Sequence, residues 1–189
     1  MKIFRFLAIS ALVLTSFASC TMVTSTNVPG KNVEKIPKNL WGKYVLEYPA
    51  ILSSFGEGNE EMEKTYVTLN AAGAIIEDKN GTSVSKLGDS LFFSTIGKQQ
   101  YITMGANEVF NVFKVVKSGN DIYLYTMSGN ASSTGDLNDY FDNVKEVTQT
   151  NEEGEEVFDR FSVTIIDDKL DDYFDTGVPL EDPFVLRKQ

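Results

Sequence analysis

The sequence has no histidine and only one cysteine in 189 residues. Without histidine, the Ser-His-Asp mechanism is excluded, and so are the common zinc, copper and iron sites built on imidazole or paired thiolates. With a single cysteine, no internal disulfide can form. Oxygen ligands remain, and these favour calcium or magnesium. We expect no cofactor, since no Gly-rich phosphate loop follows a strand and opens a helix.

Basic side chains are scarce in the last third of the chain. Residues 130–189 hold 16 Asp and Glu but only 5 Lys and Arg, and the whole chain carries a formal net charge of −10. Affinity for nucleic acid comes from Lys and Arg meeting phosphates, so we expect no nucleic-acid partner. Anionic lipid heads repel such a surface as well, so any membrane contact is expected through a lipid anchor alone.

Long apolar runs are confined to the N-terminus. Lys2 and Arg5 precede a mostly apolar stretch over residues 6–19. A spanning helix needs about 20 apolar residues, whereas this length suits a secretory signal. Small residues lead into Cys20, which resembles the lipobox of bacterial lipoproteins. The resemblance implies a signal peptide over 1–19 and a lipid on Cys20, and an ordinary secreted protein is the alternative.

The rest of the chain divides into a short linker and one domain. After Cys20, whose lipidation the lipobox resemblance implies, the residues up to 38 carry Thr, Ser, Asn, Pro and Gly with little apolar periodicity. This composition predicts a flexible tether, so residues 20–38 form the linker. Residues 39–189 are long enough to bury roughly 70% of their unfolded surface in one core. In Bacteroidetes lipoproteins an acidic cluster after the cysteine marks surface export. Residues 21–30 have no acid, so the resemblance implies the periplasmic face of the outer membrane.

Most of the domain is typical of strands. Asn80-Gly81 separates two strand-like arms, and further hairpin turns are predicted at 118–121 and 151–154. About eight to ten such strand-like segments, separated by turns, predict an antiparallel barrel or sandwich. The related stretches 137–143 and 170–176 predict two short helical turns, with Leu, Tyr and Phe on one face.

The two ends of the domain resemble lipocalins and the wider calycin family. Leu40 to Tyr44 reads LWGKY, similar to the Gly-x-Trp strand that follows a helical turn in lipocalins, and the last strand ends FVLRK. The resemblance implies an antiparallel up-and-down barrel of about eight strands. It also implies a barrel-closing group of Trp41, Gly42, Tyr44 and Arg187, in which Arg187 stacks on Tyr44 or Trp41.

Residues 87–91 contain the string GDSL, which also names a family of serine esterases. A serine needs an adjacent base to act as a nucleophile, and the chain offers no histidine for that role. We therefore expect a turn that leads into a strand. Asp-Ser-Leu also resembles the O-glycosylation sequence of exported Bacteroidetes proteins, so Ser90 is a candidate for a sugar.

The acidic run DDKLDDYFD is the remaining candidate for a metal site. It lacks the alternating acids, glycine and closing glutamate of a calcium loop, so a solvated face is the default. Asp168, Asp171, Asp172 and Asp175 remain candidates for weak calcium binding.

We expect a non-enzymatic binding protein for a small apolar or amphipathic ligand. The alternative is an envelope structural or interaction lipoprotein whose acidic surface binds a partner. An eight-stranded barrel holds one small ligand or is filled by its own side chains, and residues 20–189 contain 19 aromatic residues. The ligand-binding side chains are not assignable, because inside and outside depend on strand register.

Overall fold

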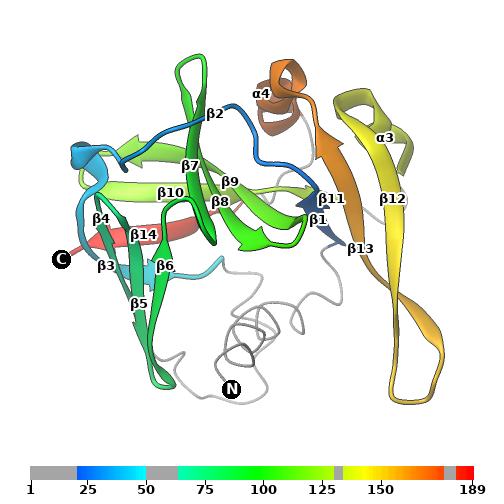
Figure 1. Cartoon of the computed structure of the whole chain (residues 1–189), viewed down its shortest axis with the longest axis horizontal. Coiled ribbons are helices and arrows are strands. Elements are labelled where there is room, and N and C mark those ends of the chain that lie inside the picture. Colours follow the sequence, from blue (N-terminus) through cyan, green and yellow to red (C-terminus); the bar gives the residue numbers. More distant parts are fainter. Residues whose placement is uncertain (1–20, 50–63, 130–133, 177–181) are drawn as a thin grey trace.

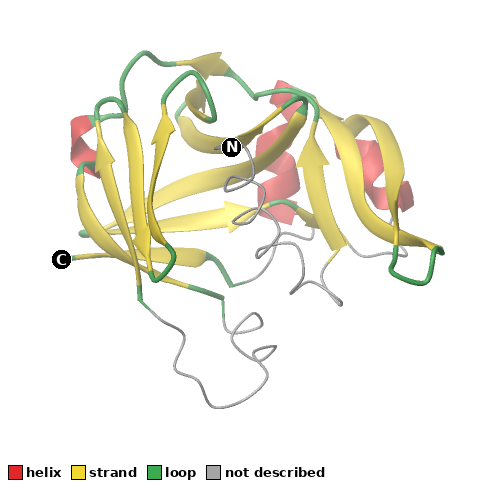
Figure 2. Ribbon diagram, turned by 60° about the horizontal axis from the view of Figure 1, so that its bottom comes forward, coloured by secondary structure: helices red, strands yellow, loops and turns green. Residues whose placement is uncertain are grey.

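The computed structural model describes residues 21–49, 64–129, 134–176 and 182–189. Over these residues the chain forms fourteen strands that join one curled, mostly antiparallel sheet (Figures 1 and 2). The prediction of a mainly antiparallel β protein is confirmed. The prediction of about eight strands is wrong, because an additional layer follows the hairpins. The signal peptide, 1–19, and Cys20 lie outside the described residues.

Four strands form a meander on one side of the molecule. They are β3 (Gly42–Glu47), β4 (Thr65–Asn70), β5 (Gly73–Asp78) and β6 (Gly81–Lys86). Asp78 pairs with Gly81, so the β5–β6 turn consists of Lys79 and Asn80 and lies one residue earlier than predicted. The side chain of Asp78 accepts a hydrogen bond from the Asn80 N–H at 2.7 Å, which holds this turn.

A second group of strands faces the first. It comprises β7 (Leu91–Ile96), β8 (Gln99–Ala106), β9 (Val109–Ser118) and β10 (Asp121–Thr126). The predicted turn at 118–121 is confirmed, since Ser118 pairs with Asp121. The last strand, β14 (Phe184–Lys188), lies between β10 and β3 and joins the two groups.

The GDSL segment interrupts the predicted up-and-down order. Within the described residues, β7 pairs with β2 and β8 rather than with β6, and an isolated parallel bridge joins Leu87, which follows β6, to Leu91 at the start of β7. Gly88 N–H donates to the Leu91 carbonyl at 2.8 Å, and Asp89 N–H donates to the Lys86 carbonyl at 3.2 Å. This turn passes the chain from one group of strands to the other. The sheet is therefore a half-barrel with a seam between β6 and β7.

A further layer covers the outer face of β8 and β9. Strands β12 (Phe141–Thr150) and β13 (Glu156–Ile165) form a long hairpin, which confirms the predicted turn near 151–154. Helix α3 (Thr134–Tyr140) precedes this hairpin and helix α4 (Asp167–Thr176) follows it. The second predicted helical turn is confirmed, whereas the first ends at Tyr140 because Phe141 already belongs to β12.

Part of the N-terminal segment for which the sequence predicts a flexible tether joins the sheet, at residues 21–25 and 31–32. Strand β1 (Thr21–Ser25) runs parallel to β13 and pairs antiparallel with β11 (Ser128–Gly129). Downstream, β2 (Lys31–Asn32) pairs with β7, and the 3-10 turn η1 (Lys38–Leu40) leads into β3. The polar composition of this segment predicts a linker, but Thr and Ser have small side chains that also fit between neighbouring strands of a sheet.

Two hydrophobic cores lie on opposite faces of β8 and β9. Tyr101 and Val112 contribute to an outer core, shared with β1, β13, α3 and α4. Ile102 and Val115 contribute to an inner core that fills the half-barrel. Alternation along each strand explains this division, because successive side chains point to opposite faces. The apolar faces predicted for both helical turns are buried in the outer core.

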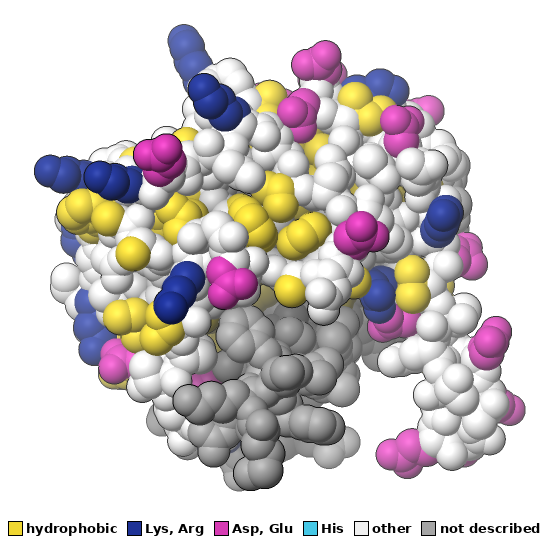
Figure 3. Space-filling view, in the orientation of Figure 1, with side chains coloured by type: hydrophobic (Ala, Val, Ile, Leu, Met, Phe, Trp, Pro, Cys, Tyr) yellow, Lys and Arg dark blue, Asp and Glu magenta, His cyan; other side chains and the backbone are white. Residues whose placement is uncertain are grey.

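Acidic side chains gather on the β12–β13 hairpin, at the lower right of Figure 3. Glu152, Glu153, Glu155 and Glu156 are all exposed in and beside its turn. Part of the charge imbalance of the sequence thus lies on this hairpin. Among the described helices, none has the length and apolarity that crossing a membrane requires.

Candidate functional site

The concave face of the half-barrel carries a group of apolar side chains that remain half-buried. Cross-strand neighbours share a face of the sheet, so the register identifies them. Leu46 pairs with the buried Leu186, and Phe184 pairs with Leu124. Phe113 pairs with the buried Ile102. We call Leu46, Tyr48, Phe113, Leu124 and Phe184 the inner wall.

Three rings form a continuous row within the inner wall. The ring centroid of Phe184 lies 6.0 Å from that of Tyr48 and 6.1 Å from that of Phe113, both in edge-on geometry. The Tyr48 hydroxyl lies 3.4 Å from the Thr65 hydroxyl. Such a row presents apolar area with a polar group at one end, which suits an amphipathic molecule.

Beyond the inner wall, the half-barrel is filled by its own side chains. Tyr44, Phe93 and Ile122 are fully buried there. Ile36 and Leu40, from the segment that precedes β3, belong to the same core and are also buried. The interior of the half-barrel thus consists of a packed centre and a half-exposed wall of apolar side chains.

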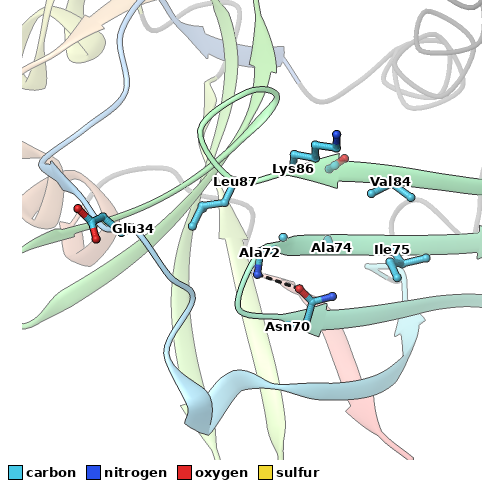
Figure 4. Close-up of a pocket in the computed structure, with 10 residues that line it drawn as sticks. Glu34, Asn70, Ala72, Ala74, Ile75, Val84, Lys86 and Leu87 are labelled. Atoms are coloured by element: carbon cyan, nitrogen blue, oxygen red, sulfur yellow. Dashed lines mark hydrogen bonds between the residues drawn. The ribbon is translucent and has the colours of Figure 1, made fainter.

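A pocket of about 440 Å³ lies outside the concave face, at the β4–β5 turn (Figure 4). Most of its lining residues come from β5 and β6, and Glu34 and Lys86 are its charged groups. Asn70 is engaged in the turn, where its Oδ1 accepts a hydrogen bond from Ala72 N–H at 2.8 Å. The lining contains no aromatic ring, so the inner wall is the better candidate for an apolar ligand.

At the outer core, a buried lysine pairs with two more exposed carboxylates. Lys114 is 7% exposed, and its Nζ lies 2.7 Å from a carboxylate oxygen of Asp171 and 2.7 Å from one of Asp175. Burial lowers the pKa of Lys114, but the two carboxylates raise this pKa by more, so the net shift is upward. The ammonium therefore stays charged and attaches α4 to β9.

Tyrosine hydroxyls complete the contact between α4 and the sheet. Tyr101 donates to Asp171 at 3.5 Å, and Tyr173 donates to the Ser128 carbonyl while accepting from Ser128 N–H at 2.9 Å. Burial raises the pKa of both hydroxyls well above their usual range, and the negative charge of Asp171 raises that of Tyr101 further. Both tyrosines stay neutral at physiological pH, as a packed helix interface requires.

The calcium candidates have a different arrangement from the one a metal site needs. Asp171 and Asp175 converge on the Lys114 ammonium, while Asp168 and Asp172 are exposed. Over the described ranges, no group of three or more metal-binding side chains is found. Sequence reasoning did not single out Lys114, although a lysine within the apolar strand VFKVV was a signal that it needed a partner.

The predicted contact of Arg187 is wrong. Arg187 lies opposite Val45 on the outer face of β14, whereas the Tyr44 side chain enters the inner core. The guanidinium donates to Asp121 at 2.7 Å and to Glu47 at 2.9 Å, and it lies 5.9 Å from the ring of Tyr123. Hydrogen bonds to Asp121 and Glu47 raise the pKa of Arg187, and the hydrogen bond from Arg187 lowers the pKa of Asp121.

The other predicted closing residues lie together near η1, without Arg187. The Tyr44 hydroxyl donates to the Leu40 carbonyl at 2.8 Å, and Trp41 Nε1 donates to the Ile36 carbonyl at 2.8 Å. The cation over the Trp41 ring is Lys38, at 5.8 Å, and Lys188 packs beside Gly42. A one-residue difference in register explains the exchange, because Lys188 rather than Arg187 pairs with Tyr44.

Ser90 lies in the turn before β7 and is half-buried. Its carbonyl accepts a hydrogen bond from Gly105 N–H at 3.0 Å, so its backbone joins the turn to β8.

Within the described part of the chain, Lys114 is the only buried charged residue. No buried pair of carboxylates is therefore present there for acid–base chemistry.

No protein-family model matches the chain, and comparison with curated proteins and with solved structures finds no match. The geometry of the inner wall is therefore the basis for the functional proposal.

Proposed function

We propose that this protein is a lipid-anchored periplasmic binding protein that holds a small apolar or amphipathic ligand against the inner wall. The observation that carries the proposal is the row of rings from Tyr48 through Phe184 to Phe113. Half-buried aromatic side chains on a concave face are typical of small-molecule sites. The packed inner core behind them gives the wall a rigid base.

The lipocalin resemblance supports the type of fold that we propose. A short helical turn precedes β3, and the last strand, β14, lies beside β3, as the resemblance implies for the two ends of the barrel. The seam between β6 and β7 and the added outer layer are departures from the family pattern. A lipocalin-like half-barrel is therefore the form that we propose.

Ligand binding is tested with a fluorescent fatty-acid analogue titrated into the purified protein. Full burial of one large apolar side chain contributes about 1.5–3 kcal/mol, so Phe184→Ala is expected to weaken binding by roughly tenfold or more. Phe158→Ala is the matched control, because that ring is 39% exposed and lies outside the inner wall. Equal affinity for the two variants would contradict the site.

The anchor is tested separately by membrane fractionation. The lipobox resemblance at residues 18–20 supports a lipid on Cys20 and the periplasmic face of the outer membrane as its location. Cys20→Ala should release the protein from membranes. A variant that still pellets with them would refute the lipoprotein proposal without affecting the ligand site.

An envelope interaction protein is the second candidate function. The exposed acidic β12–β13 hairpin favours it, since a charged projecting element fits a basic partner. Electrostatic attraction between exposed groups is screened by salt, so a partner captured at low ionic strength should be lost at high ionic strength. Capture that is unchanged by salt would count against the hairpin as the binding surface.

A further inference from the structure

Strand β6 has one open backbone edge. Within the described residues, β6 pairs with β5 alone. The Leu87 N–H donates to the Ala72 carbonyl on the β5 side, so the Lys86 carbonyl of the same planar peptide unit points away from β5. Because the direction of backbone groups alternates along a strand, the N–H and C=O groups of Thr82 and Val84 also point away from β5. These four groups have no hydrogen-bond partner in the described part of the chain.

The side chains along this edge are accessible. Val84 is 54% exposed, the largest fraction among the exposed apolar side chains of the described residues, and Thr82 is exposed as well. The pocket at the β4–β5 turn lies beside the C-terminal half of β6, since Val84, Ser85 and Lys86 contribute to its lining. Figure 4 shows Val84 and Lys86 on the outermost of three strands, with Ile75 on the next strand. A strand that approaches β6 from its open side therefore reaches the backbone directly.

The opposite end of the sheet has features that protect an edge strand, and β6 lacks them. In β12 the register against β13 shifts after Asp142 and again after Val147, and charged side chains lie between these two points. Bulges and charged side chains hinder pairing with a further strand. The register of β6 against β5 is continuous, and its one charged residue is Lys86 at the last position. Of these two sheet ends, β6 is thus the one suited to pairing.

The open edge of β6 complements a second copy of itself. In an antiparallel pair with a two-fold axis at Ser83, Thr82 of each copy lies opposite Val84 of the other copy. Their N–H and C=O groups then form four hydrogen bonds, and the Lys86 carbonyl keeps the hydrogen bond that it accepts from the Asp89 N–H. Two β-branched side chains also face each other on the outer surface, a pairing that stabilises antiparallel sheets.

We infer that this protein forms a homodimer through β6, which joins two half-barrels by one shared antiparallel strand pair. The exposed Lys79 precedes β6 and the exposed Asp89 follows it, so the two-fold axis brings opposite charges of the two copies toward each other. The same edge is used by both copies, so the assembly closes at two. The contact is smaller than a standard interface of about 1,600 Å², so we expect a weak dimer with a dissociation constant of about 0.1 mM.

Sedimentation equilibrium of the full chain, over about 10 μM to 1 mM, tests the dimer. Val84→Lys places two ammonium groups near the centre of the strand pair and should weaken dimerisation by about tenfold or more. Val109→Lys is the matched control, because Val109 is 40% exposed and lies at the start of β9, outside β6. It should dimerise like the unsubstituted chain. An unsubstituted chain that stays monomeric at the highest concentration overturns the inference, and so does equal dimerisation of the two variants.

Disulfide formation tests the register in a full chain that carries Cys20→Ala, where an introduced cysteine is the only thiol. With Ser83→Cys, the two Cα atoms face each other across the axis at about 4.5 Å, within the range of a disulfide. With Thr82→Cys, they are offset by two residues along the strands, at about 8 Å, which is too far. Oxidation should therefore cross-link Ser83→Cys at least about tenfold faster. Equal cross-linking rates would overturn the proposed strand pair, while the ligand site and the lipid anchor would be unaffected.

Discussion

Removing the two carboxylates that face Lys114 should destabilise the fold more than removing the lysine itself. Lys114 is buried with a side chain 9% exposed, whereas the side chains of Asp171 and Asp175 are 36% and 64% exposed. In Lys114→Met, the charged group that burial disfavours disappears, and both carboxylates can be hydrated. In Asp171→Asn with Asp175→Asn, the ammonium remains between β9 and α4 without a countercharge.

The expected magnitudes follow from these exposures. Pairs with exposed partners contribute about 0–1 kcal/mol, and a methionine of similar length keeps the packing, so Lys114→Met should cost about 1 kcal/mol or less. A buried charge left without its partner costs about 3–5 kcal/mol. The remaining exposure of Lys114 and the amide oxygens reduce this to about 2–3 kcal/mol for the double Asn variant. In a domain of this size, that lowers the melting temperature by roughly 4–12 °C.

Urea unfolding, followed by the fluorescence of Trp41 and by circular dichroism, measures both variants. The triple variant with Met and both Asn residues is the control, since it should recover most of the stability lost by the double variant. The expected difference between the variants would be refuted if Lys114→Met lowered the free energy of unfolding as much as the double Asn variant. It would be refuted equally by a triple variant that is no more stable than the double.

Three other outcomes follow from buried groups and from the backbone. Alkaline pH should unfold the protein: burial raises the pKa of Tyr173, and the carboxylate pair gives Lys114 a net upward shift. The stabilising contribution of Tyr173 and Lys114 is fully present below about pH 10 and is lost as pH rises through their folded-state pKa values. A free energy of unfolding that stays constant up to about pH 12 would exclude this contribution. Phe93→Ala should cost about 3–5 kcal/mol in urea unfolding, because its ring is fully buried, and a loss under 1 kcal/mol would show that the centre is loosely packed. Gly30→Ala should melt at a lower temperature than Gly97→Ala; both have positive φ, but only at Gly30 would a Cβ lie 2.5 Å from a carbonyl, that of Thr95, so equal melting would contradict the contact.

Local pattern predicted the hairpins and helical turns well, because these elements depend on residues close in sequence. The Ser118–Asp121 turn and the turn within residues 151–155 lie where Gly and Asn interrupt two strand-like arms. The apolar face of 170–176 is buried as its spacing indicates. The β5–β6 turn was misplaced by one residue, since Asn-Gly lies partly within β6.

The role of residues 21–38 was not predictable in the same way. Thr21 to Ser25 have no apolar alternation that distinguishes a strand from a linker. They become a strand because β13 and β11 offer backbone partners from more than 100 residues away. Register decided the contacts of Arg187 similarly, since a shift of one residue moves a side chain to the opposite face.

Composition alone determined what chemistry this protein lacks: without histidine, the GDSL string cannot belong to a Ser-His-Asp site. Hydrophobic patterning determined that the domain is an antiparallel β structure. Tertiary structure decided that the GDSL turn is the seam of a half-barrel, that five side chains form the inner wall, and that Lys114 holds α4. These features depend on which strands become neighbours, and long-range pairing is not encoded in any local stretch of the sequence.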